Sequence, residues 1–246
     1  LEVSLQGQDI AWVDALFTAT SATCVTGLAV VDTGTFYSRF GQDVILGLIQ
    51  LGGLGVMTYT SLVLYRWRRK VSVTDRVAVG QSLLHDPSFA LGRFLVRAVG
   101  AVLAIEAAGA AGLYLATSGR IGLYSSVFHA VSAFCNAGFS LYADSFVAWQ
   151  GSWGVNFVLM VLIVLGGLGF SVLLEVFAAG TGRRRTLPGQ PLFTWHTHIV
   201  LKTSGLLVLG GTLFIFTAEY VMQPRVAPLH VEILTSLFQS VTCRTA

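Results

Sequence analysis

One short segment occurs three times in this chain at nearly constant spacing, and this repetition is the strongest constraint on its fold. The copies are Phe17 to Leu28 (FTATSATCVTGL), Phe128 to Phe139 (FHAVSAFCNAGF) and Phe238 to Ala246 (FQSVTCRTA). From Phe17 to Phe128 is 111 residues and from Phe128 to Phe238 is 110, so the chain is built on a period of about that length. Such a period predicts that one structural unit is used several times.

Each copy combines a short helix with a bend that contains or approaches glycine. The first helix is predicted from Ala11 to Ala22, and twelve residues at about 1.5 Å each span roughly 18 Å, against a hydrocarbon core of about 30 Å. The backbone of Cys24 to Gly27 and Cys135 to Gly138 needs hydrogen-bond partners that lipid does not supply, so it must be buried in protein or line a wet cavity. A half-crossing helix followed by a glycine turn predicts a pore loop.

The composition is typical of a polytopic membrane protein. The chain is 54% hydrophobic and 11% charged, which excludes a soluble globular protein. Eleven of its fifteen Lys and Arg residues lie in two connecting segments, which the positive-inside rule places in the cytoplasm. They are Arg66, Arg68, Arg69, Lys70, Arg76, Arg93, Arg97, Arg183, Arg184, Arg185 and Lys202. This basic character reports topology and gives no argument for nucleic-acid binding.

Four apolar segments are long enough to be spanning helices: Val44 to Tyr65, Ala98 to Gly119, Ser152 to Leu174 and Ile199 to Ala218. The sequence LGGLG stands inside the first and third of them, where it predicts close helix packing rather than a ligand site. Glu106 lies inside the second. An intramembrane carboxylate is either functional or turned toward a polar bundle interior, and both interpretations stay open here.

The elements follow the order short helix, span; span, short helix, span; span, short helix. The sequence therefore predicts an all-α polytopic membrane protein made of repeated span, re-entrant pore loop and span units. Residues 1–70 form a partial first repeat, 71–92 a cytoplasmic connector, 93–182 a complete second repeat, and 183–246 a cytoplasmic turn with a partial third repeat. Because one loop cannot surround an ion, the repetition predicts a pore formed between units.

Several reactive or charged side chains lie near the loops. Cys24, Cys135 and Cys243 lack metal-ligand spacing and are predicted to be small packing residues. His129 is either a protonation switch or a neutral, hydrogen-bonded packing residue. Arg244 is predicted to point away from the pore axis, because a positive charge aimed into a cation pathway would oppose conduction. The outer acidic residues either concentrate cations or are solvated charges: Asp14, Asp32, Asp43, Asp144, Glu219 and Glu232.

The repeated segments resemble the Ktr/Trk/HKT superfamily of potassium transporters, most of all the ion-conducting membrane subunit of the Ktr type. The resemblance rests on Asp14 to Leu28, the VVDTGT that follows, LGGLG in both spans, Phe128 to Ser140, and Leu237 to Ala246. It covers essentially the whole chain. It implies four span-loop-span repeats around a pseudo-fourfold axis, of which this chain lacks the first span of repeat one, the second span of repeat three with its gate, and repeat four.

The resemblance also implies an ion-binding selectivity filter made of loop backbone. Its residues in this chain would be Val25, Thr26, Gly27, Asn136, Ala137, Gly138, Thr245 and Ala246, holding K⁺. Glycine lets the carbonyls turn inward without a side chain blocking the axis. In the family, glycine at the first of these loops goes with potassium preference and serine with sodium transport, so Gly27 implies potassium.

Partners and location follow from the same resemblance. The family works as homodimers in the cell membrane, regulated by a cytoplasmic nucleotide-binding ring, with the filter side facing outward. Val71 to Gly92 and Thr181 to Pro191 are then either docking segments for that ring or ordinary connectors. Potassium is the transported ion, sodium remains open as a coupling ion, and no covalent cofactor is implied.

Two other function classes compete with a potassium-translocating pore. A secondary transporter with broken helices could carry a small solute, although glycines at matching places in parallel repeats favour a symmetric pore. An intramembrane enzyme would need Cys135 or Cys24 within hydrogen-bond reach of His129. His129 and Cys135 are six residues apart and face different ways on a helix. The sequence therefore predicts potassium uptake, and no enzyme.

Overall fold

The computed structural model describes residues 11–55, 91–180, 192–222 and 228–245. In chain order the helices are α1 (Trp12–Thr23), α2 (Thr33–Phe36), α3 (Arg39–Gly53), α6 (Leu91–Ala116), α7 (Leu123–Phe134), a 3-10 turn (Val147–Trp149), α8 (Trp153–Gly167), α9 (Phe170–Gly180), α10 (Trp195–Met222) and α11 (Leu229–Cys243). The all-α membrane architecture is confirmed.

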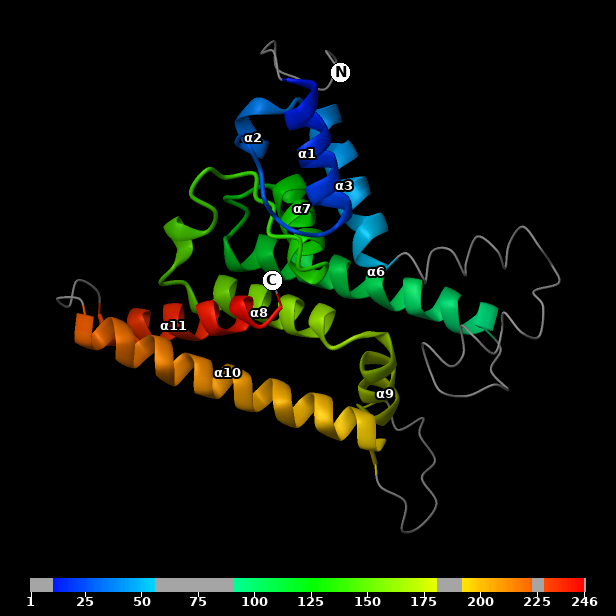
Figure 1. Ribbon diagram of the computed structural model, residues 1–246, viewed down its shortest axis with the longest axis vertical. Coiled ribbons are helices and arrows are strands. Elements are labelled where there is room, and N and C mark those ends of the chain that lie inside the picture. The colour runs from blue at the N-terminus through cyan, green and yellow to red at the C-terminus, as the bar shows by residue number, and fades with distance from the viewer. Residues whose placement is uncertain (1–10, 56–90, 181–191, 223–227, 246) are drawn as a thin grey trace.

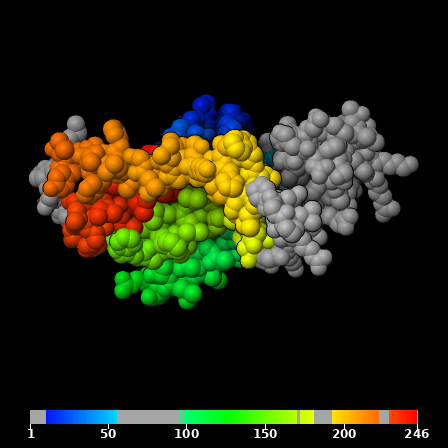
Figure 2. Space-filling model, turned by 90° about the horizontal axis from the view of Figure 1, so that it is seen from below, coloured from blue at the N-terminus to red at the C-terminus, as the bar shows by residue number. Residues whose placement is uncertain are grey.

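Two of these helices are long and apolar enough to cross a membrane unbroken. They cover Ala98–Ala116 of α6 and Trp195–Val221 of α10, which confirms the second and fourth predicted spans. Figure 2 shows α10 lying across one face of the molecule. Many of its side chains are apolar and exposed, with Leu206 and Phe214 each 73% exposed. This surface suits contact with hydrocarbon.

The third predicted span is not one continuous helix, which corrects the sequence interpretation. The helix α8 ends at Gly167, α9 starts at Phe170, and the pair is bent by 117°. Gly169 lies between them at φ +81°, a conformation that glycine adopts without steric penalty. The first predicted span behaves alike, because α3 ends at Gly53 and Gly55 has φ +76°. Residues 56–65 of that span lie outside the described ranges.

Three short helices occupy the positions that the repeat predicts. These are α1 and α7, with 12 residues each, and α11 with 15. Hydroxyl side chains on α1 donate back to carbonyls four residues earlier, as Thr18 does to Asp14 and Thr20 to Leu16. Such bonds satisfy polar side chains inside a membrane without an external partner.

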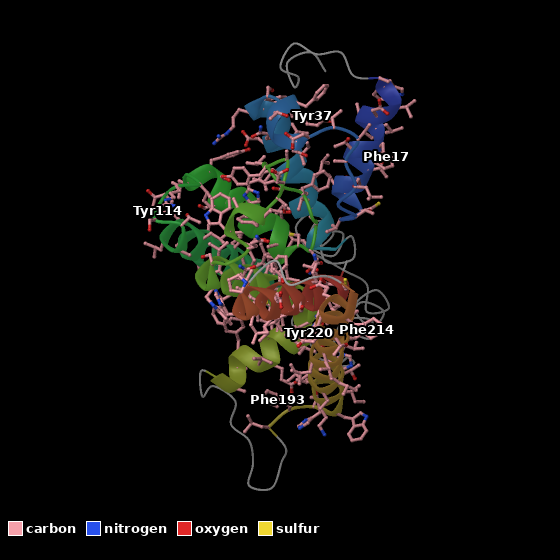
Figure 3. All side chains as sticks on the ribbon, turned by 90° about the vertical axis from the view of Figure 1, so that its left-hand side faces the viewer. Phe17, Tyr37, Tyr114, Phe193, Phe214 and Tyr220 are labelled. Atoms are coloured by element: carbon pink, nitrogen blue, oxygen red, sulfur yellow. The ribbon has the colours of Figure 1, made fainter. Side chains whose placement is uncertain are left out.

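The core joins the units through α7 and α8. Phe128 of α7 is fully buried in a cluster that also includes Ile49 of α3, Leu113 of α6 and Val155 of α8. A second cluster, Met160 and Ile163 of α8 with Leu234 and Val241 of α11, attaches the third unit. Figure 3 shows the result: Phe17 and Tyr37 of the first unit lie toward one end, while Phe193, Phe214 and Tyr220 lie toward the other.

Candidate functional site

The loops after α1 and α7 share one backbone structure. Both helices end in the Schellman arrangement, in which the chain turns left-handed and bonds back to the last turn. Thr26 N–H donates to Ser21 O at 2.9 Å, and Ala137 N–H donates to Ser132 O at 2.8 Å. The left-handed residues are Val25 (φ +57°) and Asn136 (φ +58°), followed two residues later by Gly27 (φ +82°) and Gly138 (φ +70°). Both segments are therefore loops, as predicted.

The left-handed conformation of Val25 is unusual, which indicates that the surrounding structure imposes it. The conformation costs an L-residue roughly 1–2 kcal/mol, and β-branched residues adopt it least readily. Asn136 tolerates it better, because asparagine is the residue that most often replaces glycine at this place. The same conformation at matching places in two copies indicates that the fold imposes it.

The third loop enters the same turn, with a shifted register. Thr245 N–H donates to Thr242 O at 3.1 Å, which matches the bond from Asn136 N–H to Ala133 O at 3.2 Å. Arg244 therefore caps α11 as Cys24 caps α1 and Cys135 caps α7. Alignment of the three copies by their cysteines hides this equivalence, because Cys243 lies one residue before the cap position that Cys24 and Cys135 occupy. Ala246 lies outside the described residues.

The first two loops touch through their glycines. A Cβ on Gly27 would lie 2.6 Å from the Ala137 carbonyl oxygen and 3.2 Å from Gly138 Cα. A Cβ on Gly138 would lie 3.3 Å from Gly27 Cα. No side chain fits between the two backbones, so the structure brings together two loops that are 111 residues apart in the chain.

The glycine pairs of LGGLG hold these loops. A Cβ on Gly52 would overlap the Thr23 carbonyl oxygen, and a Cβ on Gly166 would overlap the Phe134 carbonyl oxygen. These are the last residues of α1 and α7. The predicted packing role is thus confirmed, and its partners are the ends of the short helices.

The second glycine of each pair packs against the residue that begins the loop of the next repeat. Gly53 faces Cys135, and a Cβ on Gly167 would lie 2.6 Å from Arg244 Nη2. Each repeat therefore supports its own loop with one glycine and the next repeat's loop with the other. Figure 1 agrees, since the C-terminal end of α11 lies at the centre of the molecule beside α8.

Glu106 lies at the junction between the first two repeats and is 4% exposed. Gln50 Nε2 donates to its Oε1 at 3.1 Å, and Cys135 Sγ lies 3.9 Å from the same oxygen. The carboxyl group thus links α6 to α3 and to the end of α7, which favours the polar-interior interpretation. The sequence analysis missed Gln50, whose signal is a lone amide inside an uncharged apolar run.

A second link joins the same repeats farther from the loops. The Tyr124 hydroxyl donates to Asp43 Oδ1 at 2.8 Å, and the Arg39 guanidinium lies 2.9 Å from the centre of the Tyr124 ring. Burial, reinforced by the hydrogen bond to Asp43, raises the pKa of Tyr124 to about 12. The phenol therefore stays protonated, and Asp43 has a protein partner.

His129 is a neutral packing residue in this structure. It is 3% exposed, its Nδ1 lies 2.7 Å from Ser125 O, and its Nε2 accepts from Leu141 N–H at 3.2 Å. A ring nitrogen that accepts an N–H bond carries no proton, so Nδ1 is the donor. Cys135 Sγ lies near Glu106 instead, and the described hydrogen bonds include none between it and His129.

Replacing His129 with leucine is expected to destabilise the complete transporter by about 1–3 kcal/mol, because the half-buried Leu141 N–H would lose its acceptor. Thermal unfolding of purified protein measures this. Exposed His196 supplies the matched control, and His196→Leu should leave the unfolding midpoint unchanged. An uptake step near pH 6.5 that vanished in His129→Leu would instead support a protonation switch.

A cavity of about 180 Å³ opens beside Gly138. Its lining comes from α7, α8 and α11 and includes Asn136, Ile163, Phe238 and Thr245. The second and third loops therefore meet at a partly polar space, although they lie 109 residues apart, from Asn136 to Thr245.

The comparison with known proteins decides the family. Over residues 1–246 the chain matches the model of the TrkH family, described as cation transport protein. This chain belongs to the TrkH family. Because TrkH is a family of multi-pass membrane transporters, membership argues against the interpretation of the chain as an intramembrane enzyme.

Three relatives illustrate the relationship within the TrkH family. The chain is 40% identical over 244 residues to Ktr system potassium uptake protein B of Bacillus subtilis, covering 96% of this chain and 53% of that protein. It is 33% identical to potassium/sodium uptake protein NtpJ of Enterococcus hirae (99% and 53%) and 35% identical to Ktr system potassium uptake protein B of Vibrio alginolyticus (95% and 51%). The chain spans about half the length of these curated relatives.

Proposed function

We propose that this chain forms part of the pore-forming subunit of a potassium uptake transporter. Loop backbone at Val25–Thr26–Gly27, Asn136–Ala137–Gly138 and Thr245–Ala246 would replace the water around K⁺ with carbonyl oxygens. The observation that carries this proposal is the direct contact of Gly27 with Gly138 between two loops of matching left-handed geometry. Residues that serve only to end a helix would not need to meet.

The helix ends supply a second argument. The carbonyl end of a helix carries a partial negative charge of about half an electron, which favours a nearby cation. The helices α1 and α7 end four residues before Gly27 and Gly138, and α11 ends at the neighbouring turn. An uncharged loop placed at such ends attracts a cation without binding it too tightly to release.

The position of Arg244 agrees with cation passage. Its guanidinium lies against Gly167 of α8, in the place that Cys135 occupies against Gly53. This contact supports the prediction that the charge points away from the pore axis.

The identity of the ion rests on relatives. The named relatives are potassium uptake proteins, and one is a potassium/sodium uptake protein. We propose K⁺ as the transported ion, with Na⁺ as a coupling ion. Gly27, in place of the serine that goes with sodium transport, supports potassium.

Assembly belongs to the same proposal. The whole transporter would be a homodimer in the cell membrane, its loops facing outward and a nucleotide-binding ring docked on the cytoplasmic connectors. The concentration of Lys and Arg in these connectors and beside them supports the orientation. Both connectors, 71–92 and 181–191, fall largely or wholly outside the described residues.

Gly27→Ser and Gly138→Ser in the complete transporter test the filter. Each puts a side chain into the contact at a positive φ, and strain of about 1–3 kcal/mol corresponds to roughly 5- to 150-fold in an equilibrium. We expect the preference for potassium over sodium to fall by about tenfold. Rubidium uptake with competing sodium measures it.

Gly122→Ser is the matched control. Gly122 also has a positive φ, +71°, but a Cβ there would meet open space. Unchanged ion discrimination in both filter variants, at normal expression, would contradict the proposed function.

A further inference from the structure

The side chain of Asn136 connects three parts of the molecule. The neighbouring groups assign the orientation of its amide: with the nitrogen turned toward the two acceptors, it donates to Ile163 O and to Thr245 Oγ1, both at 3.2 Å. Its amide oxygen accepts from Gly167 N–H, also at 3.2 Å. The second loop is thereby attached to α8 and to the third loop at once.

The attachment point on α8 is the turn at which that helix ends. Ile163 O and Gly167 N–H are four residues apart, which is the spacing of one step of the helical ladder. A side chain that bonds into the ladder is a recognised companion of a sharp helix bend. Asn136 therefore holds the loop against a fixed point beside the break between α8 and α9.

The first loop lacks such a link. Val25 has the same backbone conformation as Asn136, and its Cγ2 lies 2.9 Å from the place of a Cβ on Gly52. An amide atom of Asn136 lies 3.1 Å from the place of a Cβ on Gly166, the matching glycine. Both side chains thus point back to their own glycine pair. Only the asparagine can hydrogen-bond there.

We propose that Asn136 is a positioning residue for ion selectivity, whose side chain fixes the third loop relative to the second. Both amide hydrogens and the amide oxygen already have protein partners, so the side chain is not an ion ligand. Its effect is to set the spacing of the carbonyls that replace the water of a monovalent cation. This inference rests on the proposed function.

The test uses the complete transporter and four variants. Asn136→Gly removes the amide while keeping a residue that favours positive φ, and Thr245→Val removes the acceptor hydroxyl. Thr245→Val should lower rubidium-over-sodium discrimination by about three- to tenfold, the effect of one hydrogen bond, and Asn136→Gly by at least as much, because it also removes the bonds to α8. The double variant should lose no more than Asn136→Gly alone, because the link to Thr245 is already broken in that single variant. Thr245→Ser, which keeps the hydroxyl, should retain more discrimination than Thr245→Val.

Ser240→Ala is the control for stability. Ser240 Oγ donates to Val208 O at 2.7 Å, so its loss weakens the attachment of α11 to α10 and leaves the loops alone. We expect a lower unfolding midpoint with unchanged discrimination.

Three results would overturn the inference: full discrimination in folded Asn136→Gly, multiplying effects in the double variant, or an equal loss in Ser240→Ala. Gly138→Ser separates this from the proposed function. If Gly138→Ser loses discrimination while Asn136→Gly keeps it, only the positioning role fails. If Gly138→Ser keeps it, the filter itself fails.

Discussion

Replacing Gly166 with alanine is expected to reduce uptake by the complete transporter to background. The added methyl group would overlap the Phe134 carbonyl oxygen and lie 2.8 Å from the Phe134 carbonyl carbon. A backbone atom cannot rotate aside as a side chain can, so α8 must separate from the end of α7. Overpacking of this kind costs about 1–3 kcal/mol, occasionally more, and here the strain falls directly behind the second loop.

Gly52→Ala should behave in the same way, since its methyl group would overlap the Thr23 carbonyl oxygen. Gly47→Ala on the same helix is the matched control, because a Cβ there meets open space and alanine favours a helix by about 0.5–1 kcal/mol. Uptake of rubidium, normalised to membrane-inserted protein, measures all three. Wild-type uptake by Gly166→Ala would show that the loop does not rest on α8 as described.

Replacing Glu106 with alanine is expected to destabilise the transporter by about 2–4 kcal/mol. The change leaves a cavity and deprives Gln50 Nε2 of its acceptor at the junction of α3, α6 and α7. Glu106→Gln should be far milder, because its amide oxygen can still accept from Gln50. Thermal unfolding in detergent measures the difference.

Exposed Glu219 provides the control for losing a carboxylate, and Glu219→Ala should change the unfolding midpoint little. The same variants separate structure from transport. If Glu106→Gln folds normally but loses uptake as fully as Glu106→Ala, the carboxyl group takes part in transport itself, contrary to a packing role.

The features that sequence could predict are those set by length and hydropathy. α6 and α10 follow from apolar runs long enough to cross a bilayer, and the short helices follow from runs too short to do so. The third repeated segment, which starts at Phe238, lies on α11 up to Cys243. The family resemblance rested on these same repeated segments, and it is confirmed.

What sequence could not predict depends on contacts between distant residues. LGGLG reads as a packing face whether or not the helix continues, so the break after Gly167 was missed. The partners of Gln50 and Asn136 lie 56 and 109 residues away, at Glu106 and Thr245. The ion-binding role of the loop residues stays a prediction.

The glycine pairs have a consequence for how such units are ordered. Gly53 of the first unit contacts Cys135 of the second, and Gly167 of the second contacts Arg244 of the third. Each contact joins a glycine of one unit to the loop of the next unit along the chain. Contacts of this head-to-tail kind give a ring its direction, since they close only when every rotation has the same sense. Cys24 occupies the position in the first unit that matches Cys135 and Arg244, and it is exposed. The same contacts place the loops of the three units in the order in which they occur along the chain.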